Sequence, residues 1–295
     1  MDQNDKILRD KKGLKDFLIF SVGLSFILEI GYIIFHLVTG KTNGLFMVAI
    51  MWTPAITGIV ISIKDYKRIN MLGVSIGRAT PILLGLFLPV VYMILSYFIS
   101  WAVLGDKTIG LESLAVSLGW EDGKGDLPIL FILSHVFVGI IPSCAGAFGE
   151  ELGWRGFMYP VMERVSGRKK AILYSGIIYG FWYLPLVISG LYETYTVRWY
   201  GVIMFMVYLF VLNFILVWLR SISKSILPPL LIRASGNLVG QMVLLQLSSD
   251  NRVPYLAGET GIVSIAFMIL TSVIGWKLWK RHDTKTEEKK EIANS

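Results

Sequence analysis

Glu150, Glu151 and Arg155 form a compact group of ionisable residues at the end of a long apolar stretch. On a helix, residues four apart share a face, so Glu151 and Arg155 are expected to form an ion pair. The helical period turns Glu150 about 100° away, which leaves its carboxylate free to act elsewhere. A free carboxylate can serve as a general base toward water. The alternative is a salt bridge at a helix end with no chemistry, and the spacing alone favours neither.

Two further pairs with a spacing of four lie inside apolar stretches. Arg233 is followed by Asn237, and Tyr179 is followed by Tyr183. A charged side chain at membrane depth is costly, so Arg233 is expected to face the protein interior and to have a partner there. Asn237 would project from the same face, either as a site residue or as a hydrogen-bond donor between helices. The tyrosine pair has the spacing of an aromatic packing stripe.

The composition indicates that these residues lie on helices that span a membrane. Of 295 residues, 54% are hydrophobic and 17% are charged, whereas soluble domains carry about 25% charged residues. A spanning helix needs roughly 20 mostly apolar residues. We therefore expect an all-α, polytopic integral membrane protein with about eight transmembrane helices, near residues 14–38, 45–63, 81–104, 127–147, 171–190, 200–219, 226–247 and 261–279.

The distribution of basic residues predicts the orientation. The N-terminal segment, every second connection and the C-terminal tail hold 22 of the 28 lysines and arginines, and such loops stay in the cytoplasm. We expect a cytoplasmic segment at residues 1–13, one membrane domain at 14–280 and a cytoplasmic tail at 281–295. The net charge of +7 is a topological signal and does not indicate nucleic-acid binding. The single cysteine, Cys144, excludes an internal disulfide.

The glutamate pair belongs to a longer pattern. Phe148–Phe157 resembles the first motif, Glu-Glu-x-x-x-Arg, of the CAAX protease and bacteriocin-processing (CPBP, Abi-type) family of intramembrane proteases. Residues 175–186 resemble the helix that carries the second motif, Phe-x-x-x-His, and residues 228–237 resemble the third, His-x-x-x-Asn. Met-Trp-Thr-Pro at 51–54 is similar to a recurrent phrase in the family's second helix. The resemblance covers the chain from about Trp52 to Asn237.

The resemblance implies a glutamate-dependent or metal-dependent hydrolase, an endopeptidase that cuts lipidated peptides or processes bacteriocin-like ones. It assigns the general base to Glu150 and retains Glu151, Arg155 and Asn237. The two motif histidines fall on Tyr183 and Arg233, and Tyr179 replaces the motif phenylalanine. Tyrosine is a rare zinc ligand and arginine has no lone pair to offer. We expect no cofactor, and a divalent metal such as zinc only at an unconventional site.

The three histidines of the chain do not restore the motifs. His36 ends the first apolar stretch and His282 lies in the tail. Phe131 and His135 do spell Phe-x-x-x-His, but they precede the first motif. We interpret His135 as an interior residue.

Arg233 is expected to pair with Glu150, since it replaces a histidine that the family directs at this glutamate. Such a pair would occupy the lone pairs of the carboxylate and weaken it as a base.

These residues are compatible with three functions. The first is a pseudoenzyme that binds a hydrophobic, prenylated or bacteriocin-like peptide, or another membrane protein, without cutting it. The second is an active endopeptidase in which Glu150 works with Tyr183 and Asn237. The third, a small transporter, ranks last, because inverted repeats and interrupted helices are not evident. The expected location is the bacterial cytoplasmic membrane.

Overall fold

The structure is a computed structural model that describes residues 2–107, 114–116, 119, 128–193 and 195–294, and within these ranges every regular element is a helix. The all-α prediction is confirmed. The α-helices are α1 (Gln3–Thr39), α2 (Gly44–Ile61), α3 (Ala79–Leu104), α5 (Pro128–Glu151), α6 (Tyr159–Ser166), α7 (Arg168–Ser189), α8 (Arg198–Ser223), α9 (Leu227–Gly236), α10 (Val253–Leu256) and α11 (Ile262–Asn294). Short π-helical segments continue three of them, namely η1 (Ser62–Tyr66), η3 (Leu152–Met158) and η4 (Asn237–Leu244), and η2 (Asn70–Leu72) is a 3₁₀ turn.

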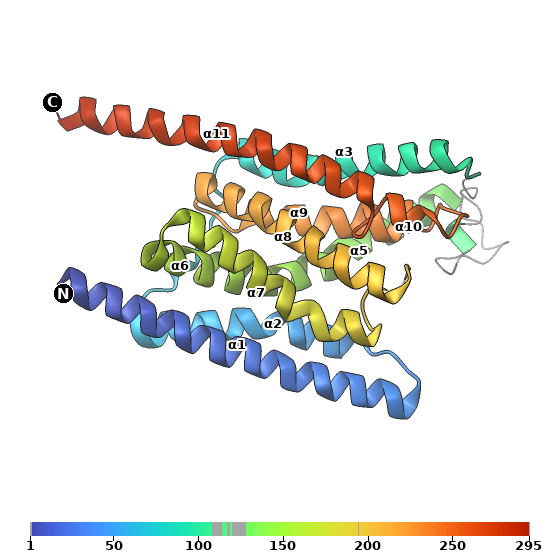
Figure 1. Ribbon diagram of the computed structural model, residues 1–295, viewed down its shortest axis with the longest axis horizontal. Helices are drawn as coiled ribbons and strands as arrows, with labels where there is room; N and C mark the ends of the chain where they lie inside the picture. Colours follow the sequence, from blue (N-terminus) through green and yellow to red (C-terminus); the bar gives the residue numbers. More distant parts are fainter. Residues whose placement is uncertain (1, 108–113, 117–118, 120–127, 194, 295) are drawn as a thin grey trace.

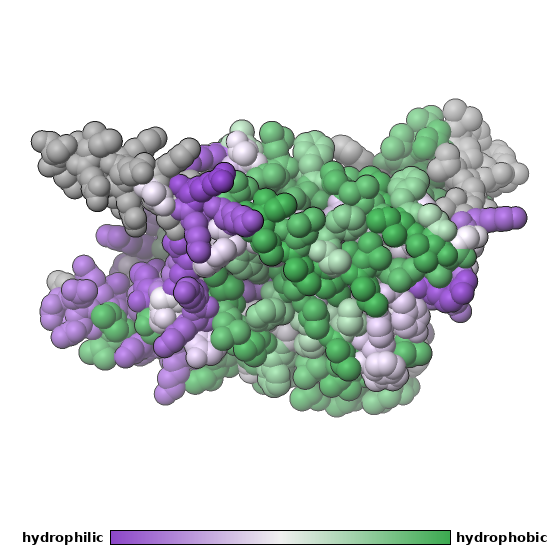
Figure 2. All heavy atoms as spheres, turned by 45° about the horizontal axis from the view of Figure 1, so that its top comes forward, coloured by the Kyte–Doolittle hydropathy of each residue, from purple (hydrophilic) through white to green (hydrophobic). Residues whose placement is uncertain are grey.

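The long helices lie side by side, and both termini emerge at the same end of the bundle (Figure 1). Within the described residues, six helices are long and apolar enough to cross a membrane: α1, α2 with η1, α3, α7, α8 and α11 as far as Arg281. A broad apolar surface separates hydrophilic groups at the two ends (Figure 2). The chain is therefore a polytopic membrane protein. Of the eight expected stretches, the other two correspond to α5 and to α9 with η4; a total of eight spans stays a prediction.

Polar caps and glycines set the helix ends. The side chain of Asn43 accepts a hydrogen bond from the backbone N–H of Leu45 at the start of α2. α1 and α7 end at Gly40 and Gly190, whose φ angles of 67° and 80° suit a residue without a Cβ atom. α1 is continuous from Gln3 through residue 13, and α11 is continuous through residues 281–294. Where the membrane begins and ends along these two helices stays a prediction.

The outer and inner faces of α1 show how the bundle is adapted to lipid. Ile27 and Val38 are largely exposed, whereas Ser21, Ser25 and Glu29 are completely buried. Apolar side chains thus face outward and polar ones inward, as expected for helices whose surroundings are hydrocarbon.

Two glycines of α5 and η3 allow α2 to come very close. A Cβ atom on Gly149 would lie 2.7 Å from the carbonyl oxygen of Met51, and one on Gly153 would lie 2.3 Å from the carbonyl carbon of Pro54. Small residues four apart permit this backbone approach in membrane helices. The contact anchors the end of α5, where Glu150 lies.

Candidate functional site

Glu150 lies in the last turn of α5 and has no exposed surface. Its Oε2 accepts a hydrogen bond from the Tyr179 hydroxyl at 2.6 Å. Its Oε1 accepts one from the Tyr183 hydroxyl at 2.7 Å and another from Arg233 Nη2 at 2.8 Å. The expected pairing with Arg233 is present. As the spacing indicated, Glu150 points away from Arg155, and α7 and α9 bring three donors to its carboxylate.

Arg233 closes a triangle of hydrogen bonds. Its Nη2 also donates to the Tyr183 hydroxyl at 2.8 Å, and that hydroxyl donates to Glu150. Only 3% of Arg233 is exposed. Because its guanidinium lies in the protein interior against a carboxylate, the charge at this depth is compensated, as the sequence required.

A second ion pair, Glu151 with Arg155, contacts Tyr179, which is one of the donors to Glu150. Arg155 Nη1 donates to Glu151 Oε1 at 3.0 Å, and both residues are buried, which confirms the expected pair. Arg155 Nη2 donates to Asn213 Oδ1 on α8 at 3.1 Å. The guanidinium also lies 4.2 Å from the ring centroid of Tyr179, so this pair supports the ring whose hydroxyl binds Glu150.

The π-helical turn η3 begins immediately after Glu151 and contains Arg155. Such turns insert an extra residue into a helix and occur often at functional sites. The backbone carbonyl of Arg155 accepts a hydrogen bond from Arg220 Nε at 3.0 Å. The wide turn is therefore tied to the end of α8, which helps to hold the Glu-Glu-x-x-x-Arg segment in place.

Asn237 does not join this network. α9 ends at Gly236, and Asn237 begins η4. Its side chain is half-buried and takes no part in the hydrogen bonds that the described residues make around Glu150. The structure thus brings Glu150, Tyr183 and Arg233 together, with the Glu151–Arg155 pair beside them, while Asn237 makes none of their hydrogen bonds. The side chain of His135 lies outside the described residues.

Comparison with known proteins adds an independent observation. Residues 129–239, which include every residue of this network, match the family model described as Type II CAAX prenyl endopeptidase Rce1-like. The chain contains an Rce1-like domain. It is also similar to CAAX prenyl protease 2 of Methanococcus maripaludis, with 26% identity over 194 residues, which is 63% of this chain and 64% of that protein. The similarity thus spans slightly less than two thirds of the relative's length.

The side chains around Glu150 in this Rce1-like domain do not fit a divalent metal ion. A metal needs electron pairs from several ligands, whereas the groups within hydrogen-bond distance of Glu150 are two hydroxyls that donate to it and a guanidinium that carries a positive charge. Arginine cannot be a ligand to a cation. Within the described residues, there is also no group of three His, Cys, Asp or Glu side chains that could hold a metal.

We did not single out three buried polar residues from the sequence, namely Asn213, Glu29 and Glu259. Asn213 was detectable as the one amide within the apolar stretch 200–219. Glu29 was equally detectable as an acid inside the first stretch, and neither of its carboxylate oxygens has a hydrogen-bond partner in the described part of the chain. Glu259 lies in a connection between apolar stretches, so nothing in the sequence predicted that it is buried.

Proposed function

We propose that this Rce1-like membrane protein binds a hydrophobic or lipidated peptide, or a segment of another membrane protein, without cleaving it. The single observation that carries the proposal is the environment of Glu150. The residue in the position of the family's general base accepts hydrogen bonds from Tyr179, Tyr183 and Arg233.

A general base must offer a lone pair to the water that it activates. Oε1 of Glu150 already accepts two hydrogen bonds and Oε2 accepts one. If Arg233 moved away from Glu150, each of the two buried side chains would lose its ion-pair partner. Breaking a buried pair in this way costs about 3–5 kcal/mol. The carboxylate is therefore held as a hydrogen-bond acceptor. In this state it stabilises α5, α7 and α9 against one another.

A groove on the apolar surface supports the binding half of the proposal. It has a volume of about 500 Å³ and lies between α3 and α11, where Leu84, Phe87, Leu88 and Leu270 are among its walls. Ligand pockets typically measure about 300–1,000 Å³ and are mostly apolar. A prenyl chain is wholly hydrocarbon, so it matches these walls, and the matching family is described as a prenyl endopeptidase family.

The orientation is part of the same proposal. Both termini lie at one end of the bundle (Figure 1), and the hydrophilic surface is most extensive there (Figure 2). Lysine and arginine remain on the cytoplasmic side, so we assign this end to the cytoplasm of a bacterial cell, with the protein in the cytoplasmic membrane. Cysteine labelling of Ser249 and Lys6 from outside intact cells tests the assignment. Only the Ser249→Cys variant is expected to react.

A cleavage and binding assay tests the function. The full chain is reconstituted in vesicles with a pool of farnesylated and unmodified peptides, and both cleavage products and bound peptide are measured. Wild type and Glu150→Ala are expected to give the same background of products, while wild type retains farnesylated peptide. Cleavage that depends on Glu150 contradicts the proposal. Equal retention of farnesylated and unmodified peptides contradicts the binding half.

A restored variant serves as the positive arm. Tyr183→His with Arg233→His returns both motif histidines and removes the guanidinium from Glu150. This variant is expected to bind zinc, as measured by metal analysis after dialysis. Zinc bound equally by wild type would mean that Arg233 leaves the carboxylate, and the proposal would then be wrong.

A further inference from the structure

A second apolar groove, the α8 groove, lies on a different face of α11 from the groove beside α3. Its volume is about 520 Å³. α8 lies between α7 and α11 and packs against both (Figure 1), and side chains of all three helices line the groove. Phe210 of α8 and Ile269 and Val273 of α11 are among them, and all three are exposed. The groove is therefore open to the surrounding lipid along its apolar length.

The α8 groove has a positively charged end. Lys169, at the start of α7, and Lys277, near the end of the apolar part of α11, both line it. Both lysines are exposed, and neither forms an ion pair within the described part of the chain. Glu163, an acid shortly before α7, is paired with Arg168 instead, at 3.0 Å. Two cations are thus available to a negatively charged group at this end.

A tryptophan places the charged end at the membrane surface. Trp276 lines the α8 groove next to Lys277, and Lys280 Nζ lies 5.2 Å from the centroid of its ring. The part of α11 that is apolar enough to cross a membrane ends at Arg281. Tryptophan is enriched at the level of the lipid headgroups, so the phosphate groups of the bilayer lie beside these lysines.

The length of the α8 groove matches one leaflet of a bilayer. Ile269 and Lys277 both line it, and a rise of 1.5 Å per residue separates them by about 12 Å along α11. Half of a hydrocarbon core of about 30 Å is about 15 Å. An amphiphile with its chain in the groove therefore has its polar group at the lysines. Within the part of the chain that the structure describes, no lysine or arginine lines the groove between α3 and α11, so the charge distinguishes the two grooves.

We propose that the α8 groove binds one anionic phospholipid of the leaflet on the side of both termini. An acyl chain lies along Phe210 and Val273, and the phosphate lies between Lys169 and Lys277. Basic pockets between membrane helices suit anionic headgroups. α7 begins at Arg168 without a side-chain cap, so its free N–H groups add to the attraction for phosphate. The lipid links α7 to α11 across α8, and because α11 also lines the groove beside α3, it steadies that wall too.

Native mass spectrometry of the full chain in detergent tests the proposal. The protein is titrated with dioleoyl phosphatidylglycerol, with phosphatidylcholine of the same chains, or with sodium phosphate. Wild type is expected to bind one phosphatidylglycerol per chain, about tenfold or more tighter than phosphatidylcholine, and no inorganic phosphate at the same concentrations. A lysine near an anionic lipid contributes about fivefold in affinity, so Lys169→Gln with Lys277→Gln is expected to weaken phosphatidylglycerol about 25-fold. Lys170→Gln removes a neighbouring charge that does not line the groove and is the control.

A second pair of variants tests the groove itself. Val273→Trp fills the α8 groove and keeps both lysines, so it is expected to weaken phosphatidylglycerol about tenfold or more. Ile274→Trp is the matched control, because Ile274 is also 49% exposed but lines the groove beside α3. All the substituted side chains are exposed, so the variants are expected to fold, and circular dichroism checks this.

Several outcomes would overturn the proposal. Equal affinity for the two lipids, or unchanged affinity in the double lysine variant, would show that the lysines do not select an anionic headgroup. A loss in Lys170→Gln as large as that in Lys169→Gln, or no loss in Val273→Trp, would assign binding to the general charge of this end. Inorganic phosphate bound as tightly as the lipid would refute the role of the acyl chain. A farnesylated peptide that displaces phosphatidylglycerol at equal concentration would assign the groove to peptides instead.

Discussion

Replacing Arg233 by methionine removes the charge that faces Glu150 while keeping a side chain of similar length. Glu150 and Arg233 are 0% and 3% exposed, and the bond between them is 2.8 Å long. Removing one partner of a buried pair costs about 3–5 kcal/mol, because the other charge is left uncompensated. The two tyrosine hydroxyls still donate to Glu150 in the variant, so we expect a loss at the lower end, about 3 kcal/mol, in the free energy of unfolding.

A double-mutant cycle isolates this pair. Glu150→Gln keeps an acceptor for the tyrosines and removes the negative charge, so adding it to Arg233→Met is expected to restore about 2 kcal/mol relative to the sum of the single losses. The assay is reversible unfolding in mixed micelles, followed by circular dichroism. Arg252→Met, which breaks the exposed pair with Asp250, is the control and should leave stability unchanged. Additive losses in the cycle would refute the reasoning that the charges depend on each other.

Three further outcomes follow from the packing and the charges. Gly153→Ala places a Cβ atom 2.3 Å from the backbone of Pro54 and is expected to lower the free energy of unfolding by about 3 kcal/mol or more, whereas Gly23→Ala, with open space around it, should be neutral in the same melt. Asn213→Leu removes the acceptor of Arg155 Nη2 and is expected to cost about 1–3 kcal/mol; a loss as small as that of a lipid-facing substitution would contradict the network. Because burial raises the pKa of Glu193 from 4.5 to about 7 on folding, the folded state holds a proton that the unfolded state has lost in this interval. Stability should therefore fall by about 3 kcal/mol as the pH rises from 4.5 to 7, and Glu193→Gln should flatten the profile.

The sequence by itself determined the class of the protein and the pairs that are local in the chain. Long apolar stretches require helices, because backbone groups in hydrocarbon must bond within their own segment, so the all-α membrane architecture followed from composition. Glu151 and Arg155 are four residues apart on one helical path, so their ion pair could be predicted too. The pairing of Arg233 with Glu150 was predictable because a charge at that depth needs a partner and the family pattern placed the two motifs together.

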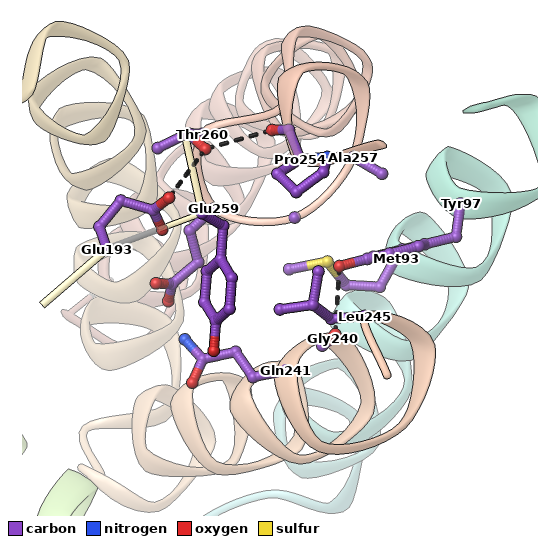
Figure 3. Close-up of a pocket in the computed structure, with 12 residues that line it drawn as sticks. Met93, Tyr97, Glu193, Gly240, Gln241, Leu245, Pro254, Ala257, Glu259 and Thr260 are labelled. Carbon is purple, nitrogen blue, oxygen red and sulfur yellow. Dashed lines mark hydrogen bonds between the residues drawn. The ribbon is translucent and has the colours of Figure 1, made fainter. Parts of the chain in front are cut away.

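Only the tertiary structure decided what surrounds each carboxylate. The spacing turned Glu150 away from Arg155 but could not show that α7 brings the hydroxyls of both Tyr179 and Tyr183 to it. Asn237 stays one helical turn after Arg233, since its N–H donates to the Arg233 carbonyl, yet its side chain takes no part in the hydrogen bonds around Glu150. Glu193 and Glu259 are 66 residues apart in the sequence, and they lie near each other because the α7–α8 connection is hydrogen-bonded to the segment that precedes α11 (Figure 3). Periodicity describes one helix at a time, whereas these sites depend on how different helices are placed against one another.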